Sequence, residues 1–501
     1  MLQFYLFTFF LQEKKSLRMY RLFSLLILTF LVNSITGQVN LQKAVDYFAN
    51  DAVNKNASIS IKIIDLDNDS SLASHHEYAS LMCASTAKLF STSSALKKLG
   101  NNYQAKTRFY TNGLIDSLGV LQGDLWIRGG GDVTLGSKYF NDDGNEFNFM
   151  NDWLDSLKSK GVLGINGRLI TDGSEFGYAG VPDGWDWSDM GNYYGVGASG
   201  VNFFDNTLKY YFNTGKPGEK VEFIGTNPVL DDLFFQHDIL AENIRKDYSY
   251  IYGSPYSKVR FGHGSLPAYK DSFCVKGSMP DPEMQLAIEF GRYLEDRSFK
   301  ISKGVFANRF LPEIDMDYDS LIHLFSYSGE SVIDIVNKTN LYSVNLYAEG
   351  LLNLLGYYST GVGSTNSGLS AVYRLWRNKV DLIGLSLKDG SGLSRKNAVS
   401  SSHFCQLLKA VYDSDIYSDF KGSLSVAGNK GTLKSVCRRQ KGENRIFAKS
   451  GTLSNVKAYS GYVQTQSGKN LAFAVIANNF NCSKSQIVKK MEFVFNAMAA
   501  Y

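Results

Sequence analysis

The chain has 501 residues, of which 44% are hydrophobic and 20% charged, a composition typical of folded globular proteins rather than disordered or fibrous ones. This length exceeds one ordinary core and indicates about three domains or sub-domains. The formal net charge of +4 is small and the basic residues are dispersed, which argues against a nucleic-acid-binding surface, since that needs a concentrated basic face.

The first 37 residues have the pattern of a secretory signal peptide. An apolar run from Leu22 to Val32 follows a basic stretch and precedes small residues that end at Gly37. The run is shorter than the ~20 residues that a membrane span needs. The sequence therefore predicts an exported protein, periplasmic or cell-wall associated, that is cleaved near Gly37 and keeps no integral membrane span.

A strand and a helix are expected in the first part of the mature chain. The apolar run Ser58–Ile64 is typical of a buried strand. A helix is predicted to follow Ser85, because Leu89 and Leu96 lie on one side of it, and to end at Gly100.

Residues 105–303 differ in composition, with short β-rich runs and many glycines and aromatic residues. One helix is clear there, with Asp281 as its N-cap and Pro282 at its first position. From about Leu321 the helical pattern returns, and one of the predicted helices stops at Gly356.

The C-terminal end is expected to form three strands and then a helix with Ser483 as its cap. The first strand begins with Arg445–Ala448, and the next two cover Ala458–Val463 and Asn470–Ile476. These patterns predict one discontinuous α/β domain, made of residues 38–104 and 304–501, with an inserted β-rich segment at 105–303.

Neither a disulfide framework nor a metal site is predicted. The five cysteines are too few and too scattered for such a framework, and none forms a C-x-x-C pair. An odd number leaves at least one thiol free or paired between chains. His75 and His76 are adjacent rather than at helical ligand spacing, and no H-E-x-x-H motif occurs. We expect no metal and no cofactor.

Three short motifs stand in order along the chain. They are S-x-x-K at Ser85 and Lys88, S-x-N at Ser343 and Asn345, and K-[S/T]-G beginning at Lys449. This set is typical of serine β-lactamases and penicillin-binding proteins.

The expected chemistry explains why each of these residue types stands at its position in the motifs. Ser85 and Lys88 lie on one face of a helix, so Lys88 can take the hydroxyl proton of Ser85 when its amine is neutral. Burial lowers a lysine pKa, and Lys449 at ~4 Å in an effective dielectric of ~20 would repel Lys88 by about 4 kcal/mol, roughly three pK units. Ser343 is expected to relay a proton to the leaving amine, and the Asn345 amide to orient a substrate peptide group.

The backbone N–H groups of Ser85 and Thr452 are the expected oxyanion hole, in which one donor is typically worth about 3–4 kcal/mol.

A single motif of this kind is weak, because other segments match by chance. They are Ser94/Lys97, Ser418/Lys421, Ser454/Lys457 and, for S-x-N, Ser364-Thr365-Asn366. Ser85 is favoured because it follows an extended segment and opens a helix, while Ser343 lies between two helices. Lys449 is expected to end a strand that begins a hairpin, and K-[S/T]-G occurs once in the chain.

With further blocks, the motifs resemble the class C low-molecular-mass penicillin-binding proteins, the D-alanyl-D-alanine carboxypeptidase/endopeptidase family of the penicillin-binding protein 4 type. The blocks are Cys83–Lys88, Gly123–Leu135, Gly184–Asp189, Asp389–Arg395, Gly428–Leu433 and Ala448–Leu453. The chain departs from the family at Cys83, where proline is usual, and at Ser450, where threonine is commoner.

The resemblance implies an α/β fold of the serine β-lactamase/transpeptidase type, an antiparallel sheet flanked by helices and split by a β-rich insert. It implies an active-site serine D-Ala-D-Ala carboxypeptidase/endopeptidase that acts on peptidoglycan stem peptides through an acyl-enzyme on Ser85, with β-lactams as covalent inhibitors.

By the same resemblance, Asp172 and Arg395 bind the side chain of the substrate peptide. Asp172 could equally shape a turn, and Arg395 could pair with a surface carboxylate. A substrate that ends in D-alanine carries a free carboxylate, which Lys449 with Ser450 or Thr452 is suited to hold.

Two alternatives stay open at this point. A β-lactamase-like serine hydrolase or esterase would use the same motifs, but it needs a dedicated deacylating base and no motif places one. A catalytically inactive peptidoglycan-binding protein is the other, although the intact motif residues count against it. A Ser-His-Asp hydrolase is disfavoured, because the chain has no G-x-S-x-G elbow. The sequence leaves open the balance of carboxypeptidase and endopeptidase action, and the oligomeric state.

Overall fold

The computed structural model describes residues 40–141, 144–312 and 317–501. The predicted signal segment, residues 1–37, lies outside the described residues. Within the described ranges, no helix combines the length and the apolar character that crossing a bilayer requires.

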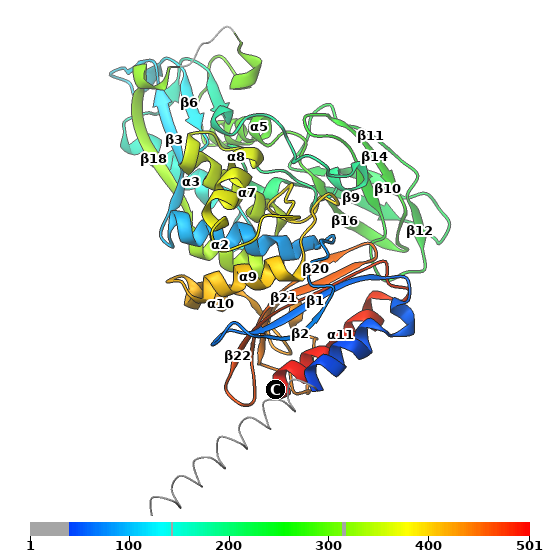
Figure 1. Ribbon diagram of the computed structural model, residues 1–501. Coiled ribbons are helices and arrows are strands. Elements are labelled where there is room, and N and C mark those ends of the chain that lie inside the picture. The colour runs from blue at the N-terminus through cyan, green and yellow to red at the C-terminus, as the bar shows by residue number, and fades with distance from the viewer. Residues whose placement is uncertain (1–39, 142–143, 313–316) are drawn as a thin grey trace, which may run out of the picture.

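A six-stranded antiparallel sheet joins the two ends of the chain (Figure 1). Its order is β19-β20-β21-β22-β1-β2. The strands are β1 (Ser58–Asp65), β2 (Ser71–His75), β19 (Ser425–Val426), β20 (Ile446–Leu453), β21 (Val456–Gln464) and β22 (Asn470–Asn478). The N-terminal β1 pairs with β22 along its whole length, with Ile61 opposite Val475. The split α/β arrangement predicted from the sequence therefore rests on this long-range pairing.

Helices cover both faces of this sheet (Figure 1). One face packs against α2 (Lys88–Leu99), α6 (Val332–Tyr342), α7 (Asn345–Thr360), α8 (Thr365–Trp376), α9 (Ser401–Tyr412) and α10 (Tyr417–Ser423). The other face packs against the helical residues 40–49 and α11 (Lys484–Ala500). Because neighbouring side chains of a strand point to opposite faces, β22 sends Ala472 and Ala474 into the first core and Phe473 and Val475 into the second.

The segment between α2 and α6 builds two further cores. The first contains a five-stranded sheet, in the order β17-β8-β6-β3-β18, packed against α3 (Asn148–Ser159) and α5 (Pro282–Glu295). Its strands are β3 (Gln104–Thr111), β6 (Leu125–Arg128), β8 (Leu169–Asp172), β17 (Val305–Ala307) and β18 (Ile322–Ser331). A small three-stranded sheet of β4 (Leu114–Ile115), β5 (Val120–Gln122) and β7 (Gly164–Ile165) adjoins it.

The second core holds small sheets rich in aromatic residues. One sheet is β10-β9-β16, another is β11-β14-β13, and β12 pairs with β15. The strands are β9 (Thr207–Thr214), β10 (Glu222–Asn227), β11 (Phe234–His237), β12 (Leu240–Glu242), β13 (Tyr250–Tyr252), β14 (Val259–His263), β15 (Ser265–Pro267) and β16 (Lys270–Ser278). A one-turn helix, α4 (Trp187–Met190), contacts β13.

Strand pairing differs from the predicted C-terminal boundary of the insert. The sequence placed this boundary at 303, but β17 and β18 pair with insert strands β8 and β3. The sheet of the insert therefore continues to Ser331. The helical pattern that begins near Leu321 in the sequence starts in the structure only at Val332, with α6.

Local signals place several helix ends correctly. Asp281 accepts a hydrogen bond from the Met284 N–H at the start of α5, and Ser483 caps α11. Gly356 does not stop α7, which continues to Thr360. Its missing side chain instead allows α8 to approach, since a Cβ there would lie 2.8 Å from the Gly368 nitrogen.

Candidate active site

Ser85 and Lys88 lie on one short turn at the start of α2. Ser85 belongs to a 3₁₀ turn, Ala84–Ala87, and the α-helix begins only at Lys88. In a 3₁₀ turn residues i and i+3 eclipse one another. Lys88 Nζ lies 3.0 Å from Ser85 Oγ, so the two side chains are as close as predicted. The turn that brings them together is a 3₁₀ turn, which is tighter than the expected α-helix.

The Lys88 amine is completely buried and has two further oxygen neighbours. It donates to Asn345 Oδ1 at 2.6 Å and to the Ser391 carbonyl at 2.7 Å. The Asn345 amide is held in this orientation because its Nδ2 donates to the Tyr194 carbonyl at 2.8 Å. The S-x-x-K and S-x-N motifs thus meet at one nitrogen atom.

Burial lowers the pKa of Lys88 to about 7, and the nearby carboxyl groups of Asp389 and Glu349 oppose this by favouring the charged form. The repulsion expected from Lys449 is not the cause. Instead, burial first and the charge of Lys88 second lower the pKa of Lys449 well below its ordinary value. Desolvation of the cation is therefore the main physical effect at both lysines.

Ser343 and Lys449 form the second half of the cluster. Ser343 ends α6 with φ = 62°, in the left-handed region, which directs the chain into α7 at Asn345. Lys449 Nζ donates to Ser343 Oγ at 2.8 Å and to the Ser450 carbonyl at 2.9 Å. The sequence predicted that Lys449 ends a strand, but it lies in the middle of β20.

The β20 strand passes directly beside the backbone of Ser85. A Cβ on Gly451 would lie 2.6 Å from the Cys83 carbonyl and 3.1 Å from the Ser85 nitrogen. Gly392, at φ = 81°, is equally tight, because a Cβ there would lie 1.9 Å from the Ala84 carbonyl. The two glycines therefore allow strand β20 and the loop at Gly392 to close around the serine.

The hydroxyl groups on β20 have partners that sequence reasoning did not assign. Ser450 Oγ donates to Thr432 Oγ1 at 2.8 Å, and Lys457 Nζ donates to Thr452 Oγ1 at 2.7 Å. Burial lowers the pKa of Lys457 to about 8. Thr432 lies in the block Gly428–Leu433, so the family resemblance could have indicated it. Lys457 belongs to a chance S-x-x-K match, and no sequence signal indicated its contact with Thr452.

Two buried carboxyl groups behind Lys88 were also missed. The Glu349 carboxyl accepts from the backbone N–H groups of Gly390 and Ser391, at 3.0 and 2.8 Å. Asp389 accepts from the backbone N–H groups of Gly392 and Ser394, among others. Burial raises the pKa of Glu349 to about 8. These contacts fix the loop whose Ser391 carbonyl faces Lys88.

Asp172 and Arg395 are held by protein groups. Asp172 is completely buried and accepts from the Ser174 N–H at 2.9 Å and the Tyr318 hydroxyl at 2.5 Å, which favours the structural reading. Arg395 Nε donates to Asp186, and Arg395 Nη2 lies 3.9 Å from Asp189. Arg395 thus pairs with carboxylates, as the structural alternative predicted. Its side chain is 36% exposed.

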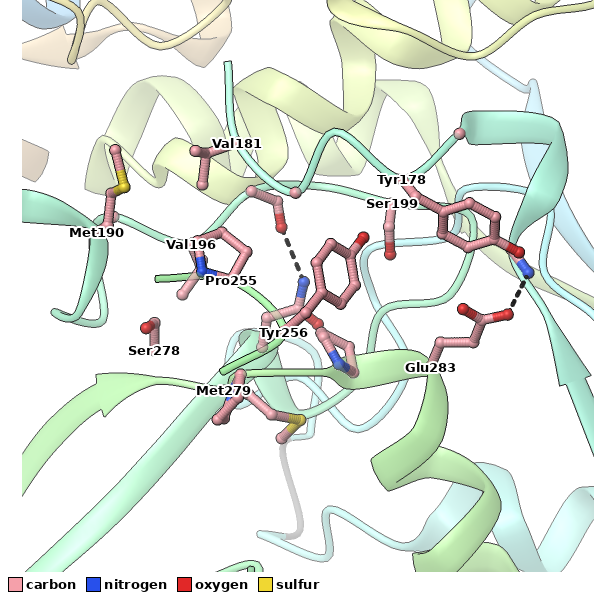
Figure 2. A pocket seen from close by; sticks show the side chains of 18 residues that line it. Tyr178, Val181, Met190, Val196, Ser199, Pro255, Tyr256, Ser278, Met279 and Glu283 are labelled. Atoms are coloured by element: carbon pink, nitrogen blue, oxygen red, sulfur yellow. Dashed lines mark hydrogen bonds between the residues drawn. The ribbon is translucent and has the colours of Figure 1, made fainter. Parts of the chain in front are cut away.

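A cavity next to Asp172 is too small for a peptide. It lies beside Gly173, Tyr178, Tyr256 and Glu283, and Glu283 accepts from the Gly173 N–H (Figure 2). Its volume of about 30 Å³ has room for about two water molecules.

Two of the chance matches, Ser94/Lys97 and the one at Ser364, have ordinary structural roles. Ser94 is buried and accepts from the Trp376 indole, and Lys97 pairs with Asp415. Ser364 caps α8. All five cysteines are free thiols, and within the described residues no group of three or more His, Cys, Asp or Glu side chains is arranged to hold a metal ion.

The chain matches a known family over most of its length. The model of the D-Ala-D-Ala carboxypeptidase 3 (S13) family matches residues 41–498. The chain belongs to this family. It is therefore a serine-type D-Ala-D-Ala carboxypeptidase, as the motifs and the resemblance predicted, and the esterase and inactive alternatives are disfavoured.

Similar proteins span nearly the whole chain. A D-alanyl-D-alanine carboxypeptidase of Actinomadura sp. (strain R39) is 25% identical over 457 residues, which cover 87% of this chain and 81% of the relative. A penicillin-sensitive carboxypeptidase A of Dictyostelium discoideum is 24% identical, over 81% of this chain and 79% of the relative.

The fold is that of penicillin-binding protein 4 from Haemophilus influenzae, with a TM-score of 0.75 at 19% identity over 89% of this chain and 97% of that protein. The predicted transpeptidase-like α/β fold is thereby confirmed.

Proposed function

We propose that this carboxypeptidase hydrolyses the D-Ala-D-Ala end of peptidoglycan stem peptides through an acyl-enzyme on Ser85. The observation that carries this is the set of three oxygen atoms around Lys88 Nζ. The Asn345 amide oxygen and the Ser391 carbonyl can only accept hydrogen bonds. A neutral lysine has two N–H donors and one lone pair, so it can donate to both and still accept the proton of Ser85.

In acylation, Ser85 Oγ bonds to the carbonyl carbon of the scissile peptide as its proton passes to Lys88. The backbone N–H groups of Ser85 and Thr452 hold the oxyanion. The C–N bond then breaks, and the leaving D-alanine amine takes the proton held by Lys88, relayed through the hydroxyl of Ser343, which accepts a hydrogen bond from Lys449. Lys88 is then neutral again. Water attacks the resulting ester as it gives a proton to Lys88, the Ser85 oxygen leaves and takes that proton back, and the shortened peptide is released.

The free carboxylate of the terminal D-alanine lies in this scheme against β20. Lys449 supplies a positive charge once the carboxylate is bound, because an opposite charge favours the protonated amine. The Thr452 hydroxyl adds a hydrogen bond, because Lys457 donates to its oxygen and leaves its proton free. The Ser450 hydroxyl adds another when it turns from Thr432 toward the carboxylate. Penicillin, which carries a carboxylate beside its strained amide, is expected to acylate Ser85 in the same position.

The catalytic unit in this proposal consists of residues 38–104 with about 332–501, and the segment between them is an insert. Strand pairing of β18 with β3 supports the shifted boundary. The protein is proposed to act outside the cytoplasm, where its substrate lies, after removal of residues 1–37.

Labelled penicillin tests the nucleophile. Mass spectrometry after proteolysis is expected to place the adduct on the peptide containing Ser85, and Lys88→Ala is expected to suppress labelling by several orders of magnitude, because an unactivated serine is a weak nucleophile. An adduct on Ser94, Ser418 or Ser454 would contradict the assignment.

Muropeptides test the reaction. Release of D-alanine from linear stem peptides would establish carboxypeptidase action on this substrate, and cleavage of cross-linked dimers would add endopeptidase action. If the purified protein is acylated by penicillin in one assay, but untreated protein releases neither product from muropeptides, the proposed substrate is wrong.

A further inference from the structure

A groove lined by tyrosines opens beside the proposed active site. Its volume is about 500 Å³, and β13, β16 and the loop before β9 contribute to its wall. The rings that line it are Tyr139, Tyr193, Tyr194, Tyr248 and Tyr250. Three of these residues are substantially exposed to solvent and therefore accessible to a ligand. Their exposed fractions are 51% for Tyr193, 60% for Tyr248 and 46% for Tyr250.

Two contacts connect this groove to the S-x-N segment. The Tyr194 carbonyl accepts the hydrogen bond from Asn345 Nδ2 at 2.8 Å. Tyr139 stacks on Tyr342, with ring centroids 5.3 Å apart, and Tyr342 directly precedes Ser343. The groove therefore adjoins the segment that carries Ser343 and Asn345.

The aromatic surface continues beyond the groove. The Tyr250 and Tyr252 rings lie 6.4 Å apart, and Trp187 stacks on Tyr252 at the same centroid distance. Trp187 is 51% exposed. Three rings thus follow one another from the groove outward, an arrangement that suits an extended ligand with a repeating apolar face.

A peptide strand is not the ligand that this surface suits. The edge strand β13 would be the obvious place to add one, but its central residue is already occupied. The Ile251 N–H donates to Asn192 Oδ1 at 3.1 Å, and the Ile251 carbonyl is covered by Gly191, whose Cβ would lie 2.1 Å from that oxygen. Recognition must therefore come from side chains rather than from a backbone ladder.

The available side chains combine flat rings with hydroxyls and amines. The phenol groups offer an apolar face and a polar tip, and Lys138 and Lys276 add N–H donors at the wall. A pyranose ring has the complementary chemistry, because its axial C–H groups form an apolar face while its hydroxyl and acetamido groups lie around the rim. An aminosugar chain repeats this face at every residue.

We infer that the tyrosine groove binds the aminosugar glycan strand to which the stem peptide is attached. This inference rests on the proposed function, since it assigns the sugar part of the same substrate. The groove holds the glycan while the peptide end reaches Ser85, so a sugar-linked peptide is a better substrate than the same peptide alone.

Direct binding is tested with a peptide-free oligomer of β-1,4-linked N-acetylglucosamine, measured by calorimetry on the wild type and on Tyr248→Ser/Tyr250→Ser. The double variant is expected to bind the oligomer at least about tenfold more weakly, as the loss of two stacking partners predicts. Tyr47→Ser is the matched control, because Tyr47 is similarly exposed, at 66%, but lies on the helical residues 40–49 on the far side of the central sheet. Equal loss in the control, or no binding by the wild type, overturns the inference.

Turnover separates the inference from the proposed function. For the wild type, kcat/KM for a disaccharide-linked pentapeptide is expected to exceed that for the free pentapeptide about tenfold, and the double variant is expected to lose this preference while keeping its rate on the free peptide. If the wild type hydrolyses both at equal rates, the glycan assignment fails and the proposed function stands. If it hydrolyses neither but binds the oligomer through the tyrosines, the proposed function fails and the groove assignment stands. A variant that loses the free and the linked peptide equally shows that the groove binds peptide, which also overturns the inference.

Discussion

At the scale of single residues, the proposed chemistry depends on how burial changes the pKa of a lysine. Lys88 is completely buried, and desolvation outweighs the opposing carboxyl groups, so its pKa falls to about 7. An ordinary lysine, with a pKa of about 10.4, would be charged at neutral pH and could not accept a proton. Its buried position therefore suits Lys88 to the proposed role of general base in the pH range where the enzyme is expected to work.

The rate of acylation by penicillin should rise with pH and level off above the Lys88 pKa, because only the neutral amine accepts the Ser85 proton. The midpoint should lie near pH 7. Asp389→Asn removes the carboxyl whose charge most strongly raises the pKa of Lys88, so the midpoint should move to lower pH. Rapid-mixing measurements across the range check this, with Glu146→Gln, which lies on the insert, as the control. A rate that falls with rising pH through this range would refute Lys88 as the base.

Lys449 should distinguish substrates by their carboxylate. Charge-assisted hydrogen bonds contribute about 1.5–3 kcal/mol each, so Lys449→Ala should lower kcat/KM for a D-Ala-terminated peptide by about tenfold to several hundredfold. An ester without the carboxylate should lose less. The informative quantity is the ratio of the two losses in the same variant. Equal losses would mean that Lys449 acts only through Ser343 and Lys88.

At the scale of elements, the site exists because a turn, a strand and a loop approach one another closely. The 3₁₀ turn at Ala84–Ala87 presents Ser85, β20 runs past its backbone, and the loop at Gly392 closes from the other side. Only a residue without a side chain fits at the two contact points, which gives the K-[S/T]-G glycine a packing reason as well as a chemical one.

Gly451→Ala should therefore separate β20 from the serine turn. The added Cβ would lie 2.6 Å from the Cys83 carbonyl, so the strand must shift, and the oxyanion donors on Ser85 and Thr452 would shift with it. Acylation should slow at least about a hundredfold, roughly the effect of losing one such donor. Gly422→Ala is the control, because nothing lies within 4 Å of its Cβ position. Unchanged acylation in Gly451→Ala would mean that the close approach is not needed for catalysis.

At the scale of the whole molecule, segments from near the start and the end of the described residues pair with each other, while the residues between α2 and α6 form separate cores. Strand β1 pairs with β22, and the central sheet is complete only when both ends are present. The segment between α2 and α6 leaves through β3 and returns beside it through β18, so its two ends are held together by one ladder. In the proposed division of the chain, such a connection lets a long segment be inserted without disturbing the central sheet.

The mature protein should begin near Gln38, just before the helical residues 40–49 that pack on the sheet. Cell fractionation and N-terminal sequencing of the protein from its own host check this. Recovery of full-length protein in the cytoplasm would contradict export.

The sequence alone determined the residues whose chemistry is fixed by short spacing. Ser85 with Lys88, and Ser343 with Asn345, are recognisable because a turn or a helix start brings them together locally. Their order along the chain, with blocks such as Gly123–Leu135, was enough to indicate the family, the fold and the carboxypeptidase activity, all of which the comparisons confirm.

Only the tertiary structure decided which distant groups lie beside Lys88 and which strand returns to pair with β3. The Ser391 carbonyl reaches Lys88 across 303 positions of the chain, and a backbone oxygen has no signature in sequence. Glu349 and Lys457 are buried by packing that no local pattern reveals. The return of β18 to β3 likewise depends on hydrogen bonds between segments about two hundred residues apart, and the energy of such pairing is settled only when the whole chain has folded.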